Sequence, residues 1–268
     1  MQIVKKISEI KEILSDLEKN NSKINLIPTM GNIHEGHLSL LKEANKFEGI
    51  NVVSVFINPT QFNDIKDFEN YPNTFDQDVK LLSKNNCEII FAPNINEMYP
   101  NGLETNKTVF EYRDILCDAF RPGHFDGVVT IVNKLFTLVE PQRAFFGLKD
   151  YQQFLHVKNL PIINNLNIDI IPCETIRSND GLAMSSRNNL LSKKGLQLAS
   201  NIYKSIKRVK DSILANQNIL NEEIDYLSKL GIEIEYYQIC DRESLESINH
   251  IINNKFIVAI AEIGRAHV

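Results

Sequence analysis

Two histidines three residues apart lie at the start of a predicted helix. The segment 28–37 reads Pro-Thr-Met-Gly-Asn-Ile-His-Glu-Gly-His and contains His34 and His37. The apolar run 24–27 predicts a short buried strand closed by Pro28, and leucines at helical spacing follow the second histidine. A helix N-terminus offers unpaired N–H groups and a partial positive charge, which suit a phosphate. We therefore expect the two imidazoles to bind an anion at this N-terminus.

The glycines of this segment favour a tight turn close to a bound ligand. Gly31 and Gly36 free the backbone between the strand and the helix. A plain surface turn with two histidines is the simplest alternative. A zinc site is a poorer one, because the segment lacks the i, i+4 histidine pair of a metalloprotease helix and no further ligand cluster is evident. Nucleotide binding is the strongest of the three interpretations.

A second polar segment follows the next predicted strand. Residues 51–57 are apolar and β-branched, which predicts a buried parallel strand, and Asn58 and Gln61 come directly after it. Ligands of open parallel sheets bind outside the carboxyl ends of the strands, so both side chains belong to the same edge as His34. The amide of Gln61 has an acceptor and a donor, which suit hydroxyl and carboxylate groups. An ordinary polar turn is the alternative.

Lys149 places a positive charge after a later strand. The segment 143–153 reads Arg-Ala-Phe-Phe-Gly-Leu-Lys-Asp-Tyr-Gln-Gln. Gly147 lets the backbone approach a ligand, and Lys149 suits a phosphate. Gln153 follows Lys149 by four residues, so a helix would place both on one face. The alternative is a solvated Lys-Asp turn.

Two serines and an arginine occur together in a loop after the predicted strand 168–172. The loop 177–188 reads Arg-Ser-Asn-Asp-Gly-Leu-Ala-Met-Ser-Ser-Arg-Asn. Ser185, Ser186 and Arg187 can bind phosphate oxygens, the arginine through a two-pronged contact. The same loop also fits a Ser-rich linker, because the composition changes here.

Two further segments have open interpretations. The stretch 121–130 predicts a loop that leads into a helix, and it either supports or covers the site or only stiffens the entry to that helix. Arg121 and His124 are therefore left out of the catalytic set. Thr74 is a predicted helix cap, and Asp78 is an acidic residue of the kind typical of a first helical turn.

Composition limits the class of protein. The chain has 268 residues, 43% of them hydrophobic, and a formal net charge of −5, which fits one large α/β domain or two smaller ones and argues against a surface that coats nucleic acid. The four cysteines are dispersed, with no Cys-x-x-Cys pair, which predicts reduced thiols. No apolar run approaches membrane-spanning length and no secretory apolar core is present, so we expect a cytoplasmic protein without membrane or nucleic-acid partners.

The remaining elements complete a Rossmann-like α/β fold with a smaller C-terminal α+β domain. A helix over 3–17 precedes the first strand, and a further strand is predicted over 88–93. The C-terminal part is predicted to hold helices over 196–214 and 221–230 and strands over 232–239 and 256–261. We assign residues 1–175 to a nucleotide- and substrate-binding domain, and 176–268 to a small C-terminal lid domain.

These motifs resemble those of a known family. The segment 34–37 is similar to the His-x-Gly-His signature of the nucleotidyltransferase and class I aminoacyl-tRNA synthetase superfamily. The longer strings Pro-Thr-Met-Gly-x-x-His-x-Gly-His and Phe-Phe-Gly-x-Lys-Asp-Tyr-Gln-Gln resemble the pantoate–β-alanine ligases, or pantothenate synthetases. Met-Ser-Ser-Arg at 184–187 is similar to that family's form of the Lys-Met-Ser-Lys-Ser loop. The resemblance covers nearly the whole chain.

The resemblance implies a ligation in two half-reactions. The carboxylate of pantoate would attack the α-phosphorus of ATP to give pantoyl adenylate and pyrophosphate. The amine of β-alanine would then attack the mixed anhydride to give pantothenate and AMP. The implied cofactors are ATP, as a substrate, and Mg²⁺, and the family implies a homodimer.

The family's site residues are carried over by the same motifs. The implied catalytic residues are His34, His37, Lys149, Ser185, Ser186 and Arg187, with His37 the usual candidate for proton donor. The implied ATP-binding residues are Met30, Gly31, His34, Gly36, His37, Gly147, Leu148, Lys149, Asp150, Ile176, Met184, Ser185, Ser186 and Arg187. The implied pantoate- and β-alanine-binding residues are Pro28, Met30, Asn58, Gln61 and Gln153. Asp78 is the implied contact of magnesium, directly or through water.

Three other functions are weighed against this one. A related transferase that makes a dinucleotide-like product would not need β-alanine. A silent nucleotide-binding or regulatory protein would bind ATP without pantoate-dependent release of pyrophosphate, and it is disfavoured because each motif residue expected for the chemistry is present. A class I synthetase fragment is less favoured still, since no basic tRNA-binding surface is evident.

The C-terminal end departs from the family pattern. A Gly-x-x-Arg-Leu-Ile-Asp-Asn ending is expected, whereas this chain ends at 263–268 with Ile-Gly-Arg-Ala-His-Val. We interpret this hexapeptide as an incomplete or read-through terminus.

Overall fold

The computed structural model describes residues 1–105, 111–248 and 255–262, so the terminal hexapeptide 263–268 lies outside the described residues. The chain divides into a larger unit, Met1–Glu111 with Arg121–Ile176, and a smaller unit, Tyr112–Phe120 with Arg177–Val268. The predicted boundary follows residue 175 and keeps 112–120 in the first domain. In the structure, this short segment instead groups with the smaller unit.

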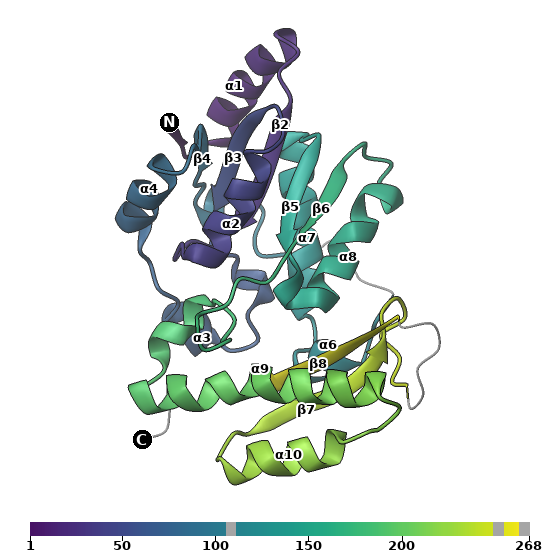
Figure 1. Ribbon diagram of the computed structural model, residues 1–268. Coiled ribbons are helices and arrows are strands. Elements are labelled where there is room, and N and C mark those ends of the chain that lie inside the picture. Colours follow the sequence, from purple (N-terminus) through teal and green to yellow (C-terminus); the bar gives the residue numbers. More distant parts are fainter. Residues whose placement is uncertain (106–110, 249–254, 263–268) are drawn as a thin grey trace. The chain divides into compact units, whose positions relative to one another are not determined.

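A parallel sheet forms the centre of the larger unit, as the Rossmann-like prediction requires (Figure 1). Its six strands are β1 (Gln2–Val4), β2 (Ile24–Thr29), β3 (Ile50–Val55), β4 (Ile89–Phe91), β5 (Arg143–Gly147) and β6 (Asp169–Cys173). Their order is β1-β4-β3-β2-β5-β6, so the chain moves outward from β2 in one direction and later crosses to β5 on its other side. The carboxyl ends of β2 and β5 therefore flank a topological switch point, the usual place for a ligand in such sheets.

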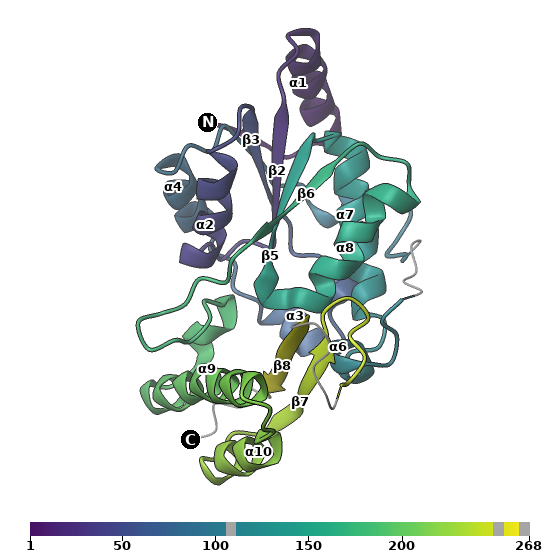
Figure 2. The ribbon, with the colours of Figure 1, turned by 45° about the vertical axis from the view of Figure 1, so that its right-hand side comes forward.

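Helices cover both faces of this sheet (Figure 2). The longer ones are α1 (Ile7–Lys19), α2 (Glu35–Ala44), α4 (Phe75–Ser83), α7 (His124–Val139) and α8 (Tyr151–Ile163). Short helices α3 (Ile65–Glu69) and α5 (Ile95–Met98) and the 3₁₀ turns η1 (Pro59–Gln61) and η2 (Leu148–Asp150) lie in the connections. The helices α2 and α4 lie on one face, and α7 and α8 lie on the other.

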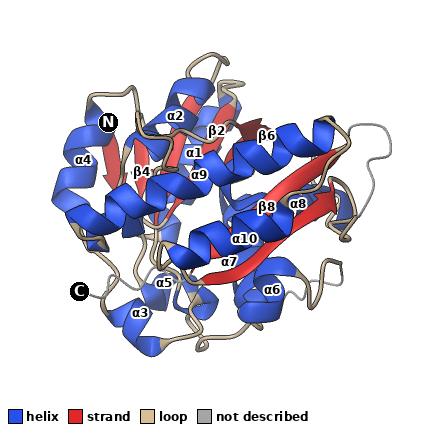
Figure 3. Ribbon diagram, turned by 60° about the horizontal axis from the view of Figure 1, so that its bottom comes forward, coloured by secondary structure: helices blue, strands red, loops and turns tan. Residues whose placement is uncertain are grey.

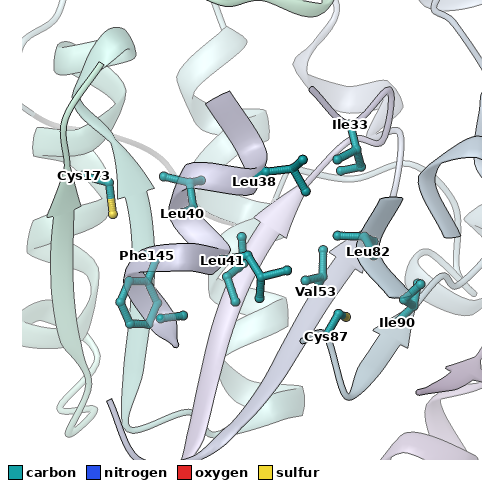
Figure 4. Close-up of a cluster of buried hydrophobic side chains, with 12 residues drawn as sticks. Ile33, Leu38, Leu40, Leu41, Val53, Leu82, Cys87, Ile90, Phe145 and Cys173 are labelled. Carbon is teal, nitrogen blue, oxygen red and sulfur yellow. The ribbon is translucent and has the colours of Figure 1, made fainter. Parts of the chain in front are cut away.

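The apolar face of α2 packs on the central strands and fixes where that helix begins. Leu38, Leu40 and Leu41 are buried in one cluster with Val53 of β3 and Phe145 of β5 (Figure 4). Because these leucines recur at helical spacing, the contact also sets the rotation of α2 about its axis. The first turn of the helix is thereby held at the carboxyl end of β2.

Two local predictions differ from the structure. Ile3 lies in β1, not in the predicted helix over 3–17, because Gln2–Val4 pairs with β4 at the edge of the sheet. Pro28 does not close β2, which continues to Thr29. The ladder between β2 and β5 covers only Asn25 and Leu26, so the missing N–H of the proline costs no bond on that side.

The smaller unit is an α+β assembly, as predicted (Figure 3). Its elements are the antiparallel strands β7 (Ile234–Asp241) and β8 (Phe256–Glu262), the helices α6 (Leu116–Phe120), α9 (Lys193–Leu214) and α10 (Leu220–Lys229), and the 3₁₀ turn η3 (Ser186–Leu190). The ring of Phe120 lies 5.9 Å from that of Tyr236, which explains why the segment 112–120 belongs here. Cys87, Cys117, Cys173 and Cys240 are free thiols, and within the described residues no helix is long and apolar enough to cross a membrane.

Removing the buried side chain of Leu41 tests the packing that positions α2. Leu41 is fully buried, so Leu41→Ala should lower the free energy of unfolding in urea by about 3 kcal/mol. Ile162→Ala is the matched control, because Ile162 is 75% exposed and its loss should cost no more than about 0.5 kcal/mol. Equal losses in the two variants would contradict the packing described here.

Candidate active site

The loop between β2 and α2 has a shape that depends on one buried carboxylate. Gly31 and Asn32 have φ angles of 79° and 50°, both in the left-handed region. Asp78 of α4, only 2% exposed, accepts the backbone N–H groups of Asn32 at 2.9 Å and Ile33 at 2.8 Å. A Cβ on Gly31 would lie 3.0 Å from a carboxylate oxygen of Asp78, so glycine is needed both for the φ angle and for the space.

The two histidines then form the entry to α2. His34 is the N-cap, and its Nδ1 accepts the backbone N–H of Gly36 at 3.1 Å. The Nδ1 of His37 accepts the backbone N–H of His34 over a longer 3.4 Å. The rings stack with their centroids 4.1 Å apart. The predicted pairing of the imidazoles at a helix N-terminus is therefore present. The N–H of Gly36, however, is bonded to His34 and is not directed to a ligand.

Both imidazoles are held in the neutral form. Burial lowers the pKa of His34, and the nearby ammonium of Lys149 lowers it further. Burial also lowers the pKa of His37 to about 3, with additional lowering by His34 and Lys149 and an opposing effect of Asp150. Since each Nδ1 accepts a backbone N–H, the ring proton must be on Nε2 in each case. The pair therefore offers two neutral N–H donors at pH 7.

Lys149 approaches the histidines from the other side of the switch point. It lies in η2, directly after β5, and its ammonium lies 3.1 Å from a carboxylate oxygen of Asp150. Its effect on the pKa of both His34 and His37 shows that the three groups share one electrostatic environment. Both members of the Lys149–Asp150 pair are partly exposed, so an incoming anion can compete for the ammonium.

The residues around Lys149 follow the predicted arrangement in part. Gly147 ends β5 with an ordinary φ of −75°, and a Cβ there would meet nothing within 4 Å, so the space before it is open. Leu148 is half-buried beside it in η2. Gln153 lies in the first turn of α8, half-buried, whereas Lys149 lies in the preceding 3₁₀ turn and not in the same helix.

A second group of predicted residues lies where β3 ends. Gln61 is the last residue of η1, and its Nε2 lies 2.9 Å from the sulfur of Met30, which follows β2. Pro28 is half-buried near the end of β2. Asn58, by contrast, is only 1% exposed, so it is poorly placed to touch a substrate itself.

Ser185, Ser186 and Arg187 belong to the smaller unit. The hydroxyl of Ser185 caps η3 by accepting the N–H of Arg187 at 3.3 Å. Ser186 is 9% exposed, and Arg187 is exposed. Met184 is half-buried in the same loop, and Ile176 is the last residue of the larger unit. The structure thus brings His34, His37 and Lys149 together, while the convergence of Ser185–Arg187 with them is part of the proposal below.

Asp78, the predicted magnesium contact, is engaged in hydrogen bonds that hold the loop, and its magnesium role stays a prediction. Both oxygens of the carboxylate accept hydrogen bonds, from two backbone amides and from the hydroxyl of Thr74 at 3.1 Å. Within the described ranges, no group of three or more His, Cys, Asp or Glu side chains is placed to hold a metal ion. Thr74 was predicted to cap α4 with its side chain, but its hydroxyl instead bonds the carboxylate of Asp78.

The stretch 121–130 contacts η1, the turn that carries Gln61. The Nδ1 of His124 lies 2.6 Å from the carbonyl oxygen of Gln61. At Gly127 a Cβ would lie 2.3 Å from the carbonyl oxygen of Thr60, so only glycine allows α7 to pack this closely on η1. Of the two interpretations left open for this stretch, support of the site is the one that these contacts favour.

The sequence patterns did not reveal the side chains that hydrogen-bond to Asn58 and so support the site. Tyr99 donates its hydroxyl to Asn58 at 2.7 Å, and Thr60 donates to the same oxygen at 3.0 Å. Tyr99 comes 41 residues after Asn58, so no local pattern could have paired them. The one available signal is the type of residue, because a buried tyrosine usually has a partner for its hydroxyl.

Comparison with known proteins gives one consistent family. A family model described as Pantoate-beta-alanine ligase matches residues 2–268. A protein named pantothenate synthetase from Thermotoga petrophila is 41% identical over 99% of this chain and 97% of its own length. Its counterpart from Buchnera aphidicola is also 41% identical, over 98% of this chain and 95% of its own length.

Solved structures agree with the sequence relatives. A pantothenate synthetase from Thermus thermophilus aligns with a TM-score of 0.86 and 32% identity over 97% of this chain and 95% of that one. A pantoate-beta-alanine ligase from Francisella tularensis, described as complexed with beta-gamma ATP and beta-alanine, aligns with a TM-score of 0.81 and 34% identity. That alignment covers 98% of this chain and 94% of the other.

Replacing Asp78 separates an anchoring role from metal binding. Asp78→Asn puts an amide nitrogen against one of two backbone N–H groups, so we expect a loss of about 1–3 kcal/mol in the free energy of unfolding even in the presence of EDTA. The control is Asp76→Asn, an exposed position on the same helix, which should change stability little. A stability effect of Asp78→Asn seen only with added Mg²⁺ would instead support a metal ligand.

The lowered pKa of His37 predicts a specific dependence of stability on pH. The unfolded chain takes up a proton near the ordinary value of 6.5, whereas the folded chain does so only near 3, so folding stability falls as pH decreases between these values. The loss is at most about 1.4 kcal/mol per pH unit. In His37→Gln this contribution is absent, and the difference in unfolding free energy between pH 7 and pH 5, measured in urea, should shrink by up to about 2 kcal/mol. An unchanged difference would show that the ring titrates normally.

Proposed function

The chain belongs to the pantoate–β-alanine ligase family and joins pantoate to β-alanine with ATP to form pantothenate, and we propose that it does so through a pantoyl adenylate made at the site described above. The observation that carries the proposal is the pair of neutral histidine donors beside Lys149, at the carboxyl ends of β2 and β5. This arrangement suits the triphosphate of ATP, because a helix N-terminus, two N–H donors and one cation meet there.

The first half-reaction requires positioning and charge stabilisation. A carboxylate oxygen of pantoate attacks the α-phosphorus of ATP, and the bond to the bridging oxygen of pyrophosphate breaks as the new phosphorus–oxygen bond forms. Negative charge then grows on the leaving pyrophosphate. His34, His37 and Lys149 would stabilise that charge by hydrogen bonds and by the ammonium, which is a preorganised electrostatic effect. Because His37 is neutral before ATP binds, we assign it hydrogen-bond donation and not the transfer of a resident proton.

The ATP and pantoate sites would adjoin each other along the switch point. Met30 and Gly31 follow β2, and Gly147, Leu148 and Asp150 surround Lys149 after β5, so the nucleotide would lie across these two strand ends. Gln61 and Gln153 would bind the hydroxyl and carboxylate groups of pantoate.

Apolar and buried groups would complete the substrate site. Pro28 and Met30 would enclose the dimethyl group of pantoate. Asn58 would act on the substrate through Gln61, since Asn58 is buried and hydrogen-bonds to the side chain of Gln61.

The family resemblance also implies a role for residues of the smaller unit. We assign Ser185, Ser186 and Arg187 to the phosphate oxygens, with Met184 and Ile176 beside the nucleotide. The reaction requires that water is kept from the mixed anhydride, which hydrolyses if it is exposed. In the second half-reaction the amine of β-alanine attacks the carbonyl carbon, the bond to AMP breaks, and the amine loses a proton.

The finer assignments stay predictions of the family resemblance. Mg²⁺ is proposed to accompany the phosphate oxygens of ATP, as it does in many nucleotide sites. A homodimer and a cytoplasmic location are proposed on the same basis.

Pyrophosphate release tests the proposed function directly. The wild-type chain with ATP and magnesium should release pyrophosphate only when pantoate is added, and AMP and pantothenate should form once β-alanine is present. Release that is independent of pantoate would favour a different acceptor. ATP binding without any release would favour the silent nucleotide-binding alternative.

Truncating the two principal phosphate-binding side chains should stop the first half-reaction without unfolding the chain. Lys149→Ala and His37→Ala should each lower pantoate-dependent pyrophosphate release by about 100-fold or more, since each removes a group that stabilises developing charge. Lys158→Ala, an exposed lysine on α8, is the matched control and should retain the wild-type rate. Wild-type rates in either site variant, in protein with an unchanged melting temperature, would refute the assigned roles.

A further inference from the structure

The side-chain amide of Asn58 has only one orientation that satisfies its neighbours. Its Nδ2 lies 3.1 Å from the carbonyl oxygen of Gly127 and 3.1 Å from Oε1 of Gln61. A backbone carbonyl can only accept a hydrogen bond, so the nitrogen of the Asn58 amide must face Gly127. The oxygen of the same amide therefore points to the opposite side.

Two hydroxyl groups meet the oxygen of Asn58. Tyr99 donates to it at 2.7 Å and Thr60 at 3.0 Å, and these two hydroxyls are themselves 3.2 Å apart. Tyr99 is 4% exposed, and burial raises the pKa of its phenol, so it keeps its proton and acts as a donor. The carbonyl of Gly127 and the phenol of Tyr99 thus specify the two ends of the Asn58 amide.

The tyrosine ring is itself held in place. Lys134 of α7 lies with its ammonium 3.8 Å from the centre of the Tyr99 ring and donates to the carbonyl of Met98 at 2.8 Å. This cation–π contact and the hydrogen bond fix both the ring and the adjoining backbone. Tyr99 can therefore act as a rigid support for Asn58.

The orientation of Asn58 decides which atom Gln61 offers to a substrate. Because Asn58 donates to Oε1 of Gln61, that oxygen is turned towards Asn58, and Nε2 is directed to the sulfur of Met30. A thioether sulfur is a weak acceptor, so an oxygen of a bound substrate can replace it. The ring of His124 hydrogen-bonds to the carbonyl oxygen of Gln61, which limits movement of η1.

We propose that Tyr99 is a positioning residue which, acting through Asn58, makes Gln61 a hydrogen-bond donor to an acceptor oxygen of pantoate. The inference rests on the proposed function, because it uses the assignment of Gln61 to the pantoate site. It adds a direction to that contact: the site selects a substrate that presents an acceptor, and not a donor, to this side chain. A group that can only donate, such as an ammonium, would leave two donors opposed there.

Removing the hydroxyl of Tyr99 tests this relay. Tyr99→Phe should raise the KM for pantoate by about tenfold and leave the KM for ATP within about twofold, because only the pantoate contact depends on Asn58. Tyr237→Phe is the matched control, since Tyr237 is also buried and its hydroxyl bonds Ser205 at 2.9 Å in the smaller unit. Equal changes in both KM values, or a pantoate KM like that of the control, would overturn the proposal.

A second variant separates the relay from general damage to the fold. Thr60 donates to the same oxygen, so Thr60→Val should weaken pantoate binding in the same direction. In the double variant Thr60→Val with Tyr99→Phe, the oxygen of Asn58 loses both hydroxyl donors. The KM for pantoate should then rise by more than the product of the two single-variant increases. Independent effects would argue against a shared role. If Tyr99→Phe does not fold, Thr60→Val alone decides, and an unchanged pantoate KM in that variant overturns the proposal.

A measurement without turnover distinguishes this inference from the proposed function. The side-chain NH₂ signals of Gln61, assigned by their loss in Gln61→Glu, should shift in ligand-free Tyr99→Phe and stay in place in Tyr237→Phe. If the wild-type chain shows no pantoate-dependent release of pyrophosphate, the proposed function fails while this result still tests the relay. An unshifted Gln61 signal in Tyr99→Phe would overturn the relay whatever the activity.

Discussion

The carboxylate of Asp78 is the contact on which the site depends most. By accepting the N–H groups of Asn32 and Ile33, it fixes the loop after β2, in which Gly31 and Asn32 are left-handed. The position of His34 as a helix cap follows from that loop, and the stacking of His37 follows from the cap. A buried carboxylate is costly unless it is well hydrogen-bonded, so the loop and the carboxylate stabilise each other.

The same principle recurs at the end of β3. Gln61 lies on a 3₁₀ turn that is held by one side chain near in sequence and one distant in sequence. His124 bonds its backbone, and Asn58 bonds its side chain. The parallel sheet brings the strand ends together, and hydrogen bonds within the loops orient the side chains of His34, His37 and Gln61. Rigid support of this kind keeps reacting groups close to the geometry that catalysis needs.

The sequence allowed the fold and the main site motifs to be predicted, because both leave local patterns. Apolar β-branched runs marked the buried strands, and the spacing of Leu38 and Leu41 marked α2. Ile3 was misassigned to a helix because a strand of three residues is too short to show its period. The partners of Asp78 and Tyr99 could not be predicted, since they lie 46 and 41 residues away and depend on tertiary packing.

The electrostatics of the site follow from burial more than from net charge. Lys149 is paired with Asp150, and the two histidines are kept neutral, so the ligand-free site carries little excess positive charge. In the proposed reaction these neutral N–H donors would bind the triphosphate, and their hydrogen bonds would strengthen as negative charge develops on the leaving pyrophosphate. An interaction that grows between the ground state and the transition state accelerates the reaction, whereas uniform tight binding does not. In that reaction the neutral pair would therefore contribute to the rate of adenylate formation and not only to the binding of ATP.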